Sequence, residues 1–113
     1  MTSQGSAHGR FTRALERRNL FAAEMALREL HTVSLLDALD YLALLAELRP
    51  QKTERAAVRW HGRLEIEAAN LTLAEAQLAL AALASLAAGE REAVDILRRL
   101  VRRARPTVPP QVR

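Results

Sequence analysis

The sequence of 113 residues contains no cysteine and has only four aromatic residues, Phe11, Phe21, Tyr41 and Trp60. Without cysteine neither a disulfide nor a thiolate metal site can form, and a small secreted scaffold without these links would be unusual. We therefore expect a protein of the reducing cytoplasm. The apolar half of the sequence is nearly all Ala, Leu and Val, a composition that favours closely packed helices over a sheet.

Long apolar runs are also missing. The first nine residues contain no apolar segment behind a basic one, and later apolar stretches are interrupted by Glu, Gln or Ser well short of about 18 residues. We expect neither export nor a membrane-spanning segment. The length fits one domain. We place this domain at residues 10–105, after a flexible N-terminal segment at 1–9 and before an extended or disordered, proline-rich tail at 106–113.

The basic residues are almost all arginine, sixteen against one lysine, and they gather at the two ends of the chain. Residues 1–19 carry four Arg and one Glu, a net charge of +3, and residues 90–113 carry seven Arg against three acids, a net charge of +4. Residues 20–49 carry two Arg against five acids, a net charge of −3. Basic ends of this kind can attract nucleic acid or another anionic surface.

Capping residues and helix breakers divide most of the chain into helices. Ser34, Thr53 and Thr72 can each cap a helix N-terminus, and Thr72 with Glu75 has the spacing of a capping box. Gly89 and the prolines mark helix ends. The connections are short and therefore predict antiparallel neighbours. The predicted helices lie near residues 35–48, 54–69, 73–88 and 90–104.

Residues 10–31 fit either one long helix or two shorter helices. Asn19 is unfavourable inside a helix and favourable as a cap, and Leu20, Ala23 and Leu27 begin a new apolar stripe after it. We therefore predict that the chain folds back at Asn19 and forms a helical hairpin.

An internal similarity relates two of the predicted helices. Residues 32–48 align without a gap on residues 70–86, with seven of seventeen positions identical, and the caps Ser34 and Thr72 coincide. An offset of this size, 38 residues from 32 to 70, is typical of helix-hairpin repeats, in which each pair buries its apolar side against the next.

The stretch A-L-E-R-R-N-L-F-A-A-E-M-A-L, Ala14 to Leu27, resembles the turn of tetratricopeptide-type repeats, where Ala-Leu ends one helix and Gly-Asn or Gly-Asp opens the next. Arg18 stands at the position of the turn glycine. We expect an all-α fold of about five to six helices, a right-handed stack of antiparallel hairpins similar to tetratricopeptide or HEAT repeats. The arginine usage, the caps and the Trp60-His61 pair also resemble short all-helical actinobacterial proteins, a resemblance that implies a fold and a source but no activity.

No catalytic motif is present. The hydroxyl residues are mostly used as caps, no His-Glu-x-x-His or Glu-x-x-His pair occurs, and no glycine-rich loop follows a strand. His61 and Glu65 have i, i+4 spacing and could share a metal ion, but a hydrogen-bonded helix histidine is the favoured interpretation. We expect no enzyme activity, no cofactor, no metal and no small-molecule substrate.

Two groups of residues are candidates for interaction. Arg55, Arg59 and Arg63 form an i, i+4, i+8 ladder, which is either a solvated face or a surface that binds carboxylate or phosphate. Trp60 lies within this ladder and is either a core residue, with Gly62 allowing a neighbouring helix to approach, or an exposed anchor. The second group is the basic surface of the last helix, where charge either solubilises the helix or binds an anion. It contains Arg98, Arg99, Arg102 and Arg103.

Residues 73–88 suggest what the protein does. They are Leu and Ala almost throughout, so this helix must be buried centrally or covered by a partner. The leading hypothesis is a noncatalytic helical-repeat module, an adaptor or assembly partner, that binds another protein or a second copy of itself. The alternative is a nucleic-acid-binding protein that uses the basic terminal helices.

Overall fold

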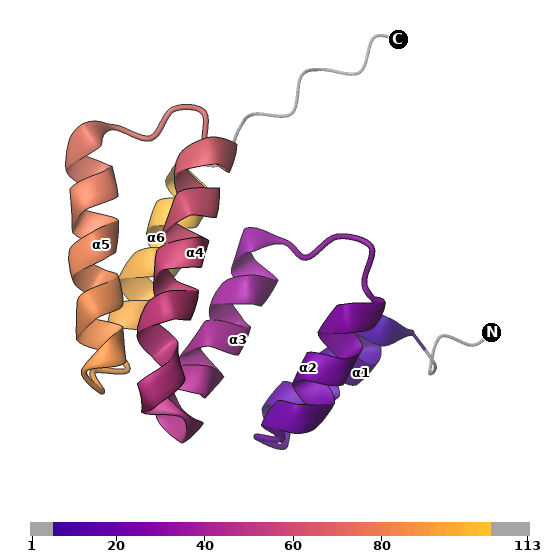
Figure 1. Ribbon diagram of the computed structural model, residues 1–113. Helices are drawn as coiled ribbons and strands as arrows, with labels where there is room; N and C mark the ends of the chain where they lie inside the picture. The colour runs from indigo at the N-terminus through magenta and orange to yellow at the C-terminus, as the bar shows by residue number, and fades with distance from the viewer. Residues whose placement is uncertain (1–5, 105–113) are drawn as a thin grey trace, which may run out of the picture.

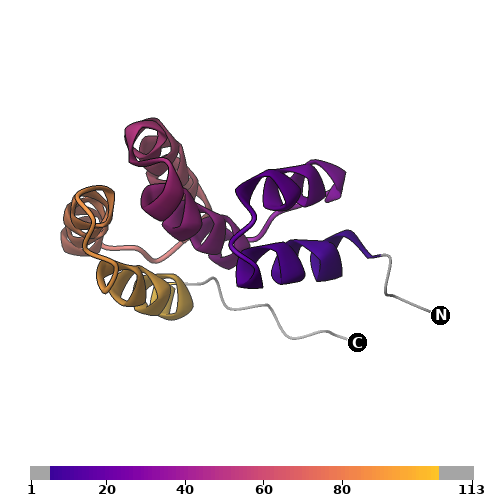
Figure 2. The ribbon, with the colours of Figure 1, turned by 90° about the horizontal axis from the view of Figure 1, so that it is seen from below.

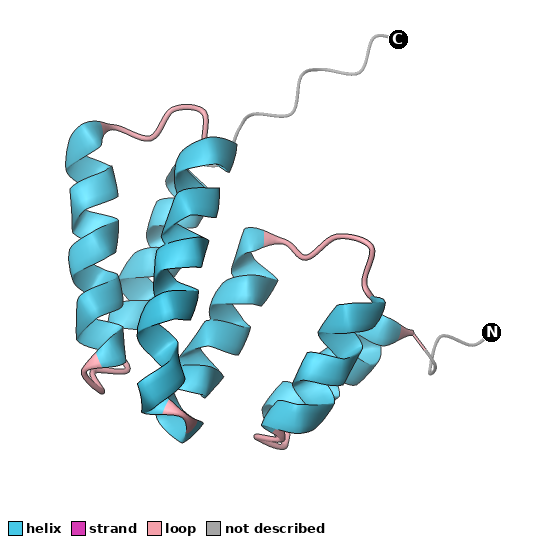
Figure 3. Cartoon of the chain, in the orientation of Figure 1, coloured by secondary structure: helices cyan, strands magenta, loops and turns pink. Residues whose placement is uncertain are grey.

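The computed structural model describes residues 6–104, and within this range all regular structure is helical. The all-α fold class with five to six helices is thereby confirmed (Figures 1 and 3). A single 3₁₀ turn, η2 (Pro50–Lys52), lies between α3 and α4. The six α-helices are α1 (Ala7–Glu16), α2 (Leu20–Glu29), α3 (Leu35–Leu48), α4 (Thr53–Glu67), α5 (Leu73–Ala87) and α6 (Ala93–Ala104).

The first helix begins earlier than the sequence predicted. The Ser6 hydroxyl accepts a hydrogen bond from Gly9 N at 3.0 Å and caps α1, so residues 7–9 belong to this helix. The rest of the predicted N-terminal segment and the predicted tail at 106–113 lie outside the described residues.

The predicted fold-back at Asn19 is confirmed. Arg18 adopts a left-handed conformation with φ of 57°, and Asn19 N donates to Ala14 O at 2.9 Å, which closes the C-terminus of α1. The Asn19 side chain then accepts a hydrogen bond from Ala22 N at 3.0 Å and caps α2. Two hydrogen bonds at one residue therefore end one helix and start the next.

Most of the other predicted boundaries also agree with the structure. Ser34 caps α3, and Thr72 and Glu75 form the reciprocal capping box of α5. Gly89, with φ of 102°, follows the end of α5. Thr53 is an exception. It does not cap α4, because the helix continues from η2 and the Thr53 hydroxyl donates to Arg49 O at 3.2 Å while the residue is fully buried.

Two hydrophobic cores hold the helices together. Helices α3 to α6 share the larger core, because α3 packs on both α4 and α6 while α5 packs on the same two helices. Leu39, Leu64 and Leu97 are completely buried there. The α1–α2 hairpin packs against α3 and encloses a smaller core around Phe11 and Ala23. Figure 2 shows this hairpin at one end of the molecule and α5 with α6 at the other.

The repeat stack itself stays a prediction. The two similar segments do form corresponding helices, α3 and α5, each with its cap at the aligned position. However, α6 returns to α3, and the four helices α3 to α6 therefore surround one common core.

Candidate functional site

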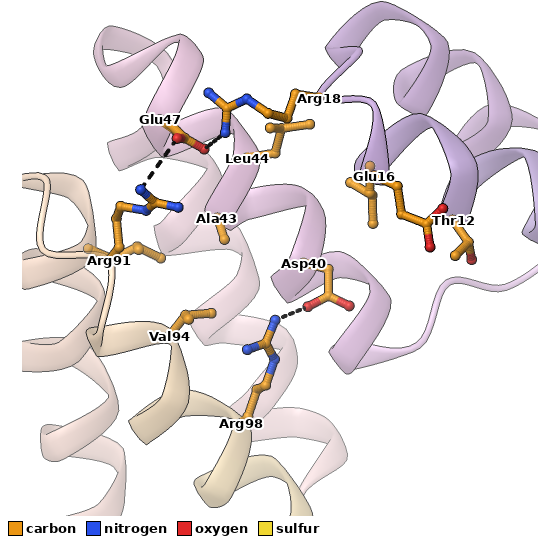
Figure 4. Close-up of a pocket in the computed structure, with 12 residues that line it drawn as sticks. Thr12, Glu16, Arg18, Asp40, Ala43, Leu44, Glu47, Arg91, Val94 and Arg98 are labelled. Carbon is orange, nitrogen blue, oxygen red and sulfur yellow. Dashed lines mark hydrogen bonds and ion pairs between the residues drawn. The ribbon is translucent and has the colours of Figure 1, made fainter.

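Helix α3 carries a groove on each side. The α3–α4 groove has a volume of about 520 Å³ and a largely apolar lining from α3 and α4. The α1–α3–α6 groove has a volume of about 480 Å³ and reaches from α1 across α3 to α6 (Figure 4). The two grooves differ in the charges that line them.

The α4 wall of the α3–α4 groove is one stripe of that helix. Ala56, Arg59, Arg63 and Ile66 follow at i, i+3, i+7 and i+10, a spacing that places them on one helix face. Ile66 is 84% exposed at the edge of the groove. The spacing of the sequence predicted the two arginines as part of a ladder with Arg55 but did not predict the apolar residues that accompany them. The α3 side contributes Ala38, Tyr41 and Leu42.

Trp60 is a core residue. It is 4% exposed, and its indole Nε1 donates to Leu35 O at 2.9 Å, which ties α4 to the first turn of α3. The interpretation of Trp60 as an exposed anchor is therefore wrong. Its ring contributes to the wall of the groove but offers little free surface.

The charges on this wall are all positive. Arg59 is exposed and forms no ion pair within residues 6–104, and Arg55, one turn earlier, is in the same state. Arg63 is half-buried. Its guanidinium donates to Val33 O at 2.7 Å and to Glu67 at 2.7 Å. The residues that line the groove thus include two arginines and no acid.

Tyr41 connects the groove to the N-terminal hairpin. Its hydroxyl donates to Glu24 Oε2 of α2 at 2.5 Å. Burial and this hydrogen bond raise the pKa of Tyr41 above its ordinary value of 10.0, whereas Arg28 and Arg59 act in the opposite direction. Arg28 lies on α2 and Arg59 on α4, so the two positive charges act on the phenol from different helices.

Gly62 lines the same groove in the interior of α4, and no internal contact explains it. Apart from its chain neighbours and the nearby backbone of α4, a methyl group built on its Cα would have no atom within 4 Å, and its backbone does not have a positive φ. The expectation that a neighbouring helix approaches Gly62 is therefore wrong within the described part of the chain. The space beside this glycine is open.

The α1–α3–α6 groove is lined by balanced charges. Glu47 on α3 pairs with Arg18 at 2.6 Å and with Arg91 at 3.7 Å, and Arg98 on α6 pairs with Asp40 at 2.6 Å (Figure 4). The hydrogen bond from Arg18 holds the pKa of Glu47 below its ordinary value of 4.5. These ion pairs link three helical segments across an apolar floor.

The basic surface of α6 is partly neutralised. Arg98 binds Asp40 and Asp95, and Arg103 binds Glu75 of α5. Arg99 and Arg102 are exposed and make no ion pair within residues 6–104. The structure therefore does not bring the four predicted arginines together as one anion-binding cluster.

Two of the three histidines have structural partners. His61 Nε2 donates to Ala76 O at 2.9 Å, as the favoured interpretation required, while its Nδ1 lies 3.8 Å from Glu65. His8 lies in α1, 3.1 Å from Asp37. No three His, Asp or Glu side chains within residues 6–104 are arranged to hold a metal ion. None of the described helices is both long enough and apolar enough to cross a membrane.

The outer face of α5 is apolar and exposed. This helix lies at the edge of the molecule and not at its centre (Figure 1). Leu73 is 78% and Leu80 is 52% exposed, and Ala81 and Ala84 are exposed beside them. Gln77 is the polar residue on this face. Of the two predicted environments for this helix, central burial is therefore wrong.

Comparison with protein-family models, curated proteins and solved structures gives no match to this chain.

Proposed function

We propose that the protein is a noncatalytic protein-interaction module. The observation that carries this proposal is the uncharged outer face of α5, on which Leu73, Leu80 and Ala84 are exposed to water. Apolar surface of this extent on a small domain is unfavourable in water and typical of a surface that a partner covers. The partner is a second copy of the chain or another protein.

Sedimentation velocity over a range of concentrations tests self-association. We expect the wild-type protein to associate and Leu80→Glu to shift it toward the monomer, because a buried carboxylate in the contact is strongly unfavourable. Gln51→Glu adds the same charge at an exposed position of η2 and is the matched control. A strictly monomeric wild-type protein that also co-purifies with no protein from its native cell would contradict the proposal.

Binding of nucleic acid is the second candidate, because Arg99 and Arg102 are exposed on α6. It has less support, since Arg98 and Arg103 are paired with acids and Phe21 is the one large exposed aromatic side chain within residues 6–104. Titration of labelled DNA and RNA at several salt concentrations measures it. No binding at about 50 mM salt would leave this candidate without support.

A further inference from the structure

We propose that the α3–α4 groove binds an amphipathic α-helix of another protein, apolar on the face that enters the groove and acidic along its flanks. This inference rests on the proposed interaction function and names a surface and a class of partner. The surface is separate from the outer face of α5.

The groove has the chemistry of a helix-binding site. Its floor and walls are formed by Ala38, Leu42, Ala56 and Ile66, and it lies along two adjacent helices. An amphipathic helix that enters such a groove buries residues at i, i+3, i+4 and i+7. Ile66 is almost fully exposed in the free protein and would be covered by this contact.

Gly62 supplies an independent reason to expect a close partner. Glycine inside a helix is less favourable than alanine, and this glycine has neither a positive φ nor a neighbouring atom that would collide with a side chain. It does, however, line the groove. Close approach of another backbone would require a residue without a side chain at this point, and no described segment of this chain supplies that backbone.

The positive charges beside the groove favour a partner helix with acidic flanks. Arg59 on the groove wall is exposed without an ion pair within residues 6–104, and Arg63 follows one turn later. The positive charge of Arg28 on α2 also acts on Tyr41. The nearby acids are already engaged, Glu24 by Tyr41 and Glu67 by Arg63. A carboxylate on the flank of a partner helix would pair with the free guanidinium of Arg59. A second copy of this chain, with a net charge of +4, is less complementary than an acidic protein.

Peptide titration tests the inference with the full-length protein. The probes are designed helical peptides of about 18 residues, five turns, with Leu and Ala at i, i+3, i+4 and i+7 and with either Glu or Lys on the flanks. Calorimetry and the fluorescence of Trp60, the single tryptophan and a residue of the groove, report binding. We expect the Glu peptides to bind at least about tenfold more tightly than the Lys peptides.

Substitutions at Gly62 separate binding from folding. Gly62→Ala should raise the denaturation midpoint, because alanine is the better helix former. It should nevertheless lower the affinity for the Glu peptide by about tenfold. Gly62→Leu should abolish binding. Arg59→Glu should reverse the preference toward the Lys peptide. No binding of any peptide by the wild-type protein, or unchanged binding by Gly62→Leu, would overturn the inference.

Leu80→Glu on α5 distinguishes this inference from the proposed function. We expect this variant to bind the Glu peptide as the wild-type protein does, because α5 does not line the groove. Self-association without peptide binding would overturn the groove inference alone. A wild-type protein that does not self-associate, co-purifies with no protein and binds no peptide would overturn both proposals.

Discussion

Arg18 and Gly89 occupy the same position in two equivalent helix ends. After α1, Arg18 N donates to Leu15 O and the next amide donates to Ala14 O; after α5, Gly89 N donates to Leu86 O and the next amide donates to Ser85 O. Both residues have positive φ, a conformation that glycine adopts without the steric cost that a side chain brings. Arg18 adopts this conformation despite its side chain, and its guanidinium forms an ion pair with Glu47 of α3.

Replacement of Arg18 should therefore change stability in opposite directions for glycine and alanine. Arg18→Gly removes a left-handed strain of roughly 1 kcal/mol and loses an exposed ion pair that contributes a few tenths, so we expect the free energy of unfolding to rise by about 0.5 kcal/mol. Arg18→Ala keeps the strain and loses the pair, so we expect it to fall. Denaturant unfolding measures both variants, and a decrease for both would show that the ion pair outweighs the strain.

At the scale of the helical element, Asn19 both ends α1 and caps α2. Its backbone N–H closes α1, and its side-chain oxygen caps α2. The stripe of Leu20, Ala23 and Leu27 could continue an earlier helix as easily as begin a new one, and the cap resolves this ambiguity.

Asn19→Ala removes the cap of α2 and should lower the free energy of unfolding by about 1 kcal/mol, the usual loss at an N-cap. In one continuous helix the same substitution would be stabilising, because alanine is the better helix former. Asn19→Asp keeps an acceptor at the cap and should be close to the wild-type protein. Denaturant midpoints at unchanged slope measure both, and a raised midpoint for Asn19→Ala would contradict the hairpin.

At the scale of the whole molecule, Tyr41 joins two separately formed cores. Its ring packs against both the core of α3 to α6 and the small core of the α1–α2 hairpin. Its hydroxyl is bonded to Glu24 on α2. The hairpin is thus attached to the four-helix part by this half-buried side chain, by Leu20 of α2 on the larger core, and by the pairs Arg18–Glu47 and His8–Asp37.

Tyr41→Phe should lower the free energy of unfolding near neutral pH by about 1 kcal/mol, because it deletes one hydrogen bond and leaves Glu24 without its donor. It should also reduce sensitivity to alkali. The pKa of Tyr41 is raised in the folded protein by burial and by Glu24, so wild-type stability declines as the pH rises above 10.0, where the unfolded chain ionises first.

Unfolding curves of both proteins near neutral pH and above pH 10.0 check this prediction. Glu24→Gln is the matched control, since it keeps an acceptor for the hydroxyl but removes the negative charge beside the phenol. An equal alkaline decline in the wild-type protein and in Tyr41→Phe would show that another group is responsible.

The sequence by itself determined the helices and most of their ends. Asn19, Ser34, Thr72 and Gly89 act on amides and carbonyls within a few residues, so their effects can be read without knowledge of the rest of the chain. The prediction that Thr53 caps α4 was wrong because the local backbone there is already ordered by another element. The 3₁₀ turn at Pro50–Lys52 already directs the chain into α4, and the Thr53 hydroxyl is used for a bond back to Arg49.

Only the tertiary structure decided which helix faces are covered. A periodic stripe defines an apolar face but not the neighbour that meets it. The sequence therefore left Trp60 between core and surface, and residues 73–88 between central burial and cover by a partner. The return of α6 to α3 buries Leu97 and leaves α5 at the edge. The same packing pairs Arg98 with Asp40, 58 residues apart in the chain, while Arg59 remains unpaired beside an open groove. Contacts between distant segments decide which of these charges are paired, and the local spacing of residues does not predict that pairing.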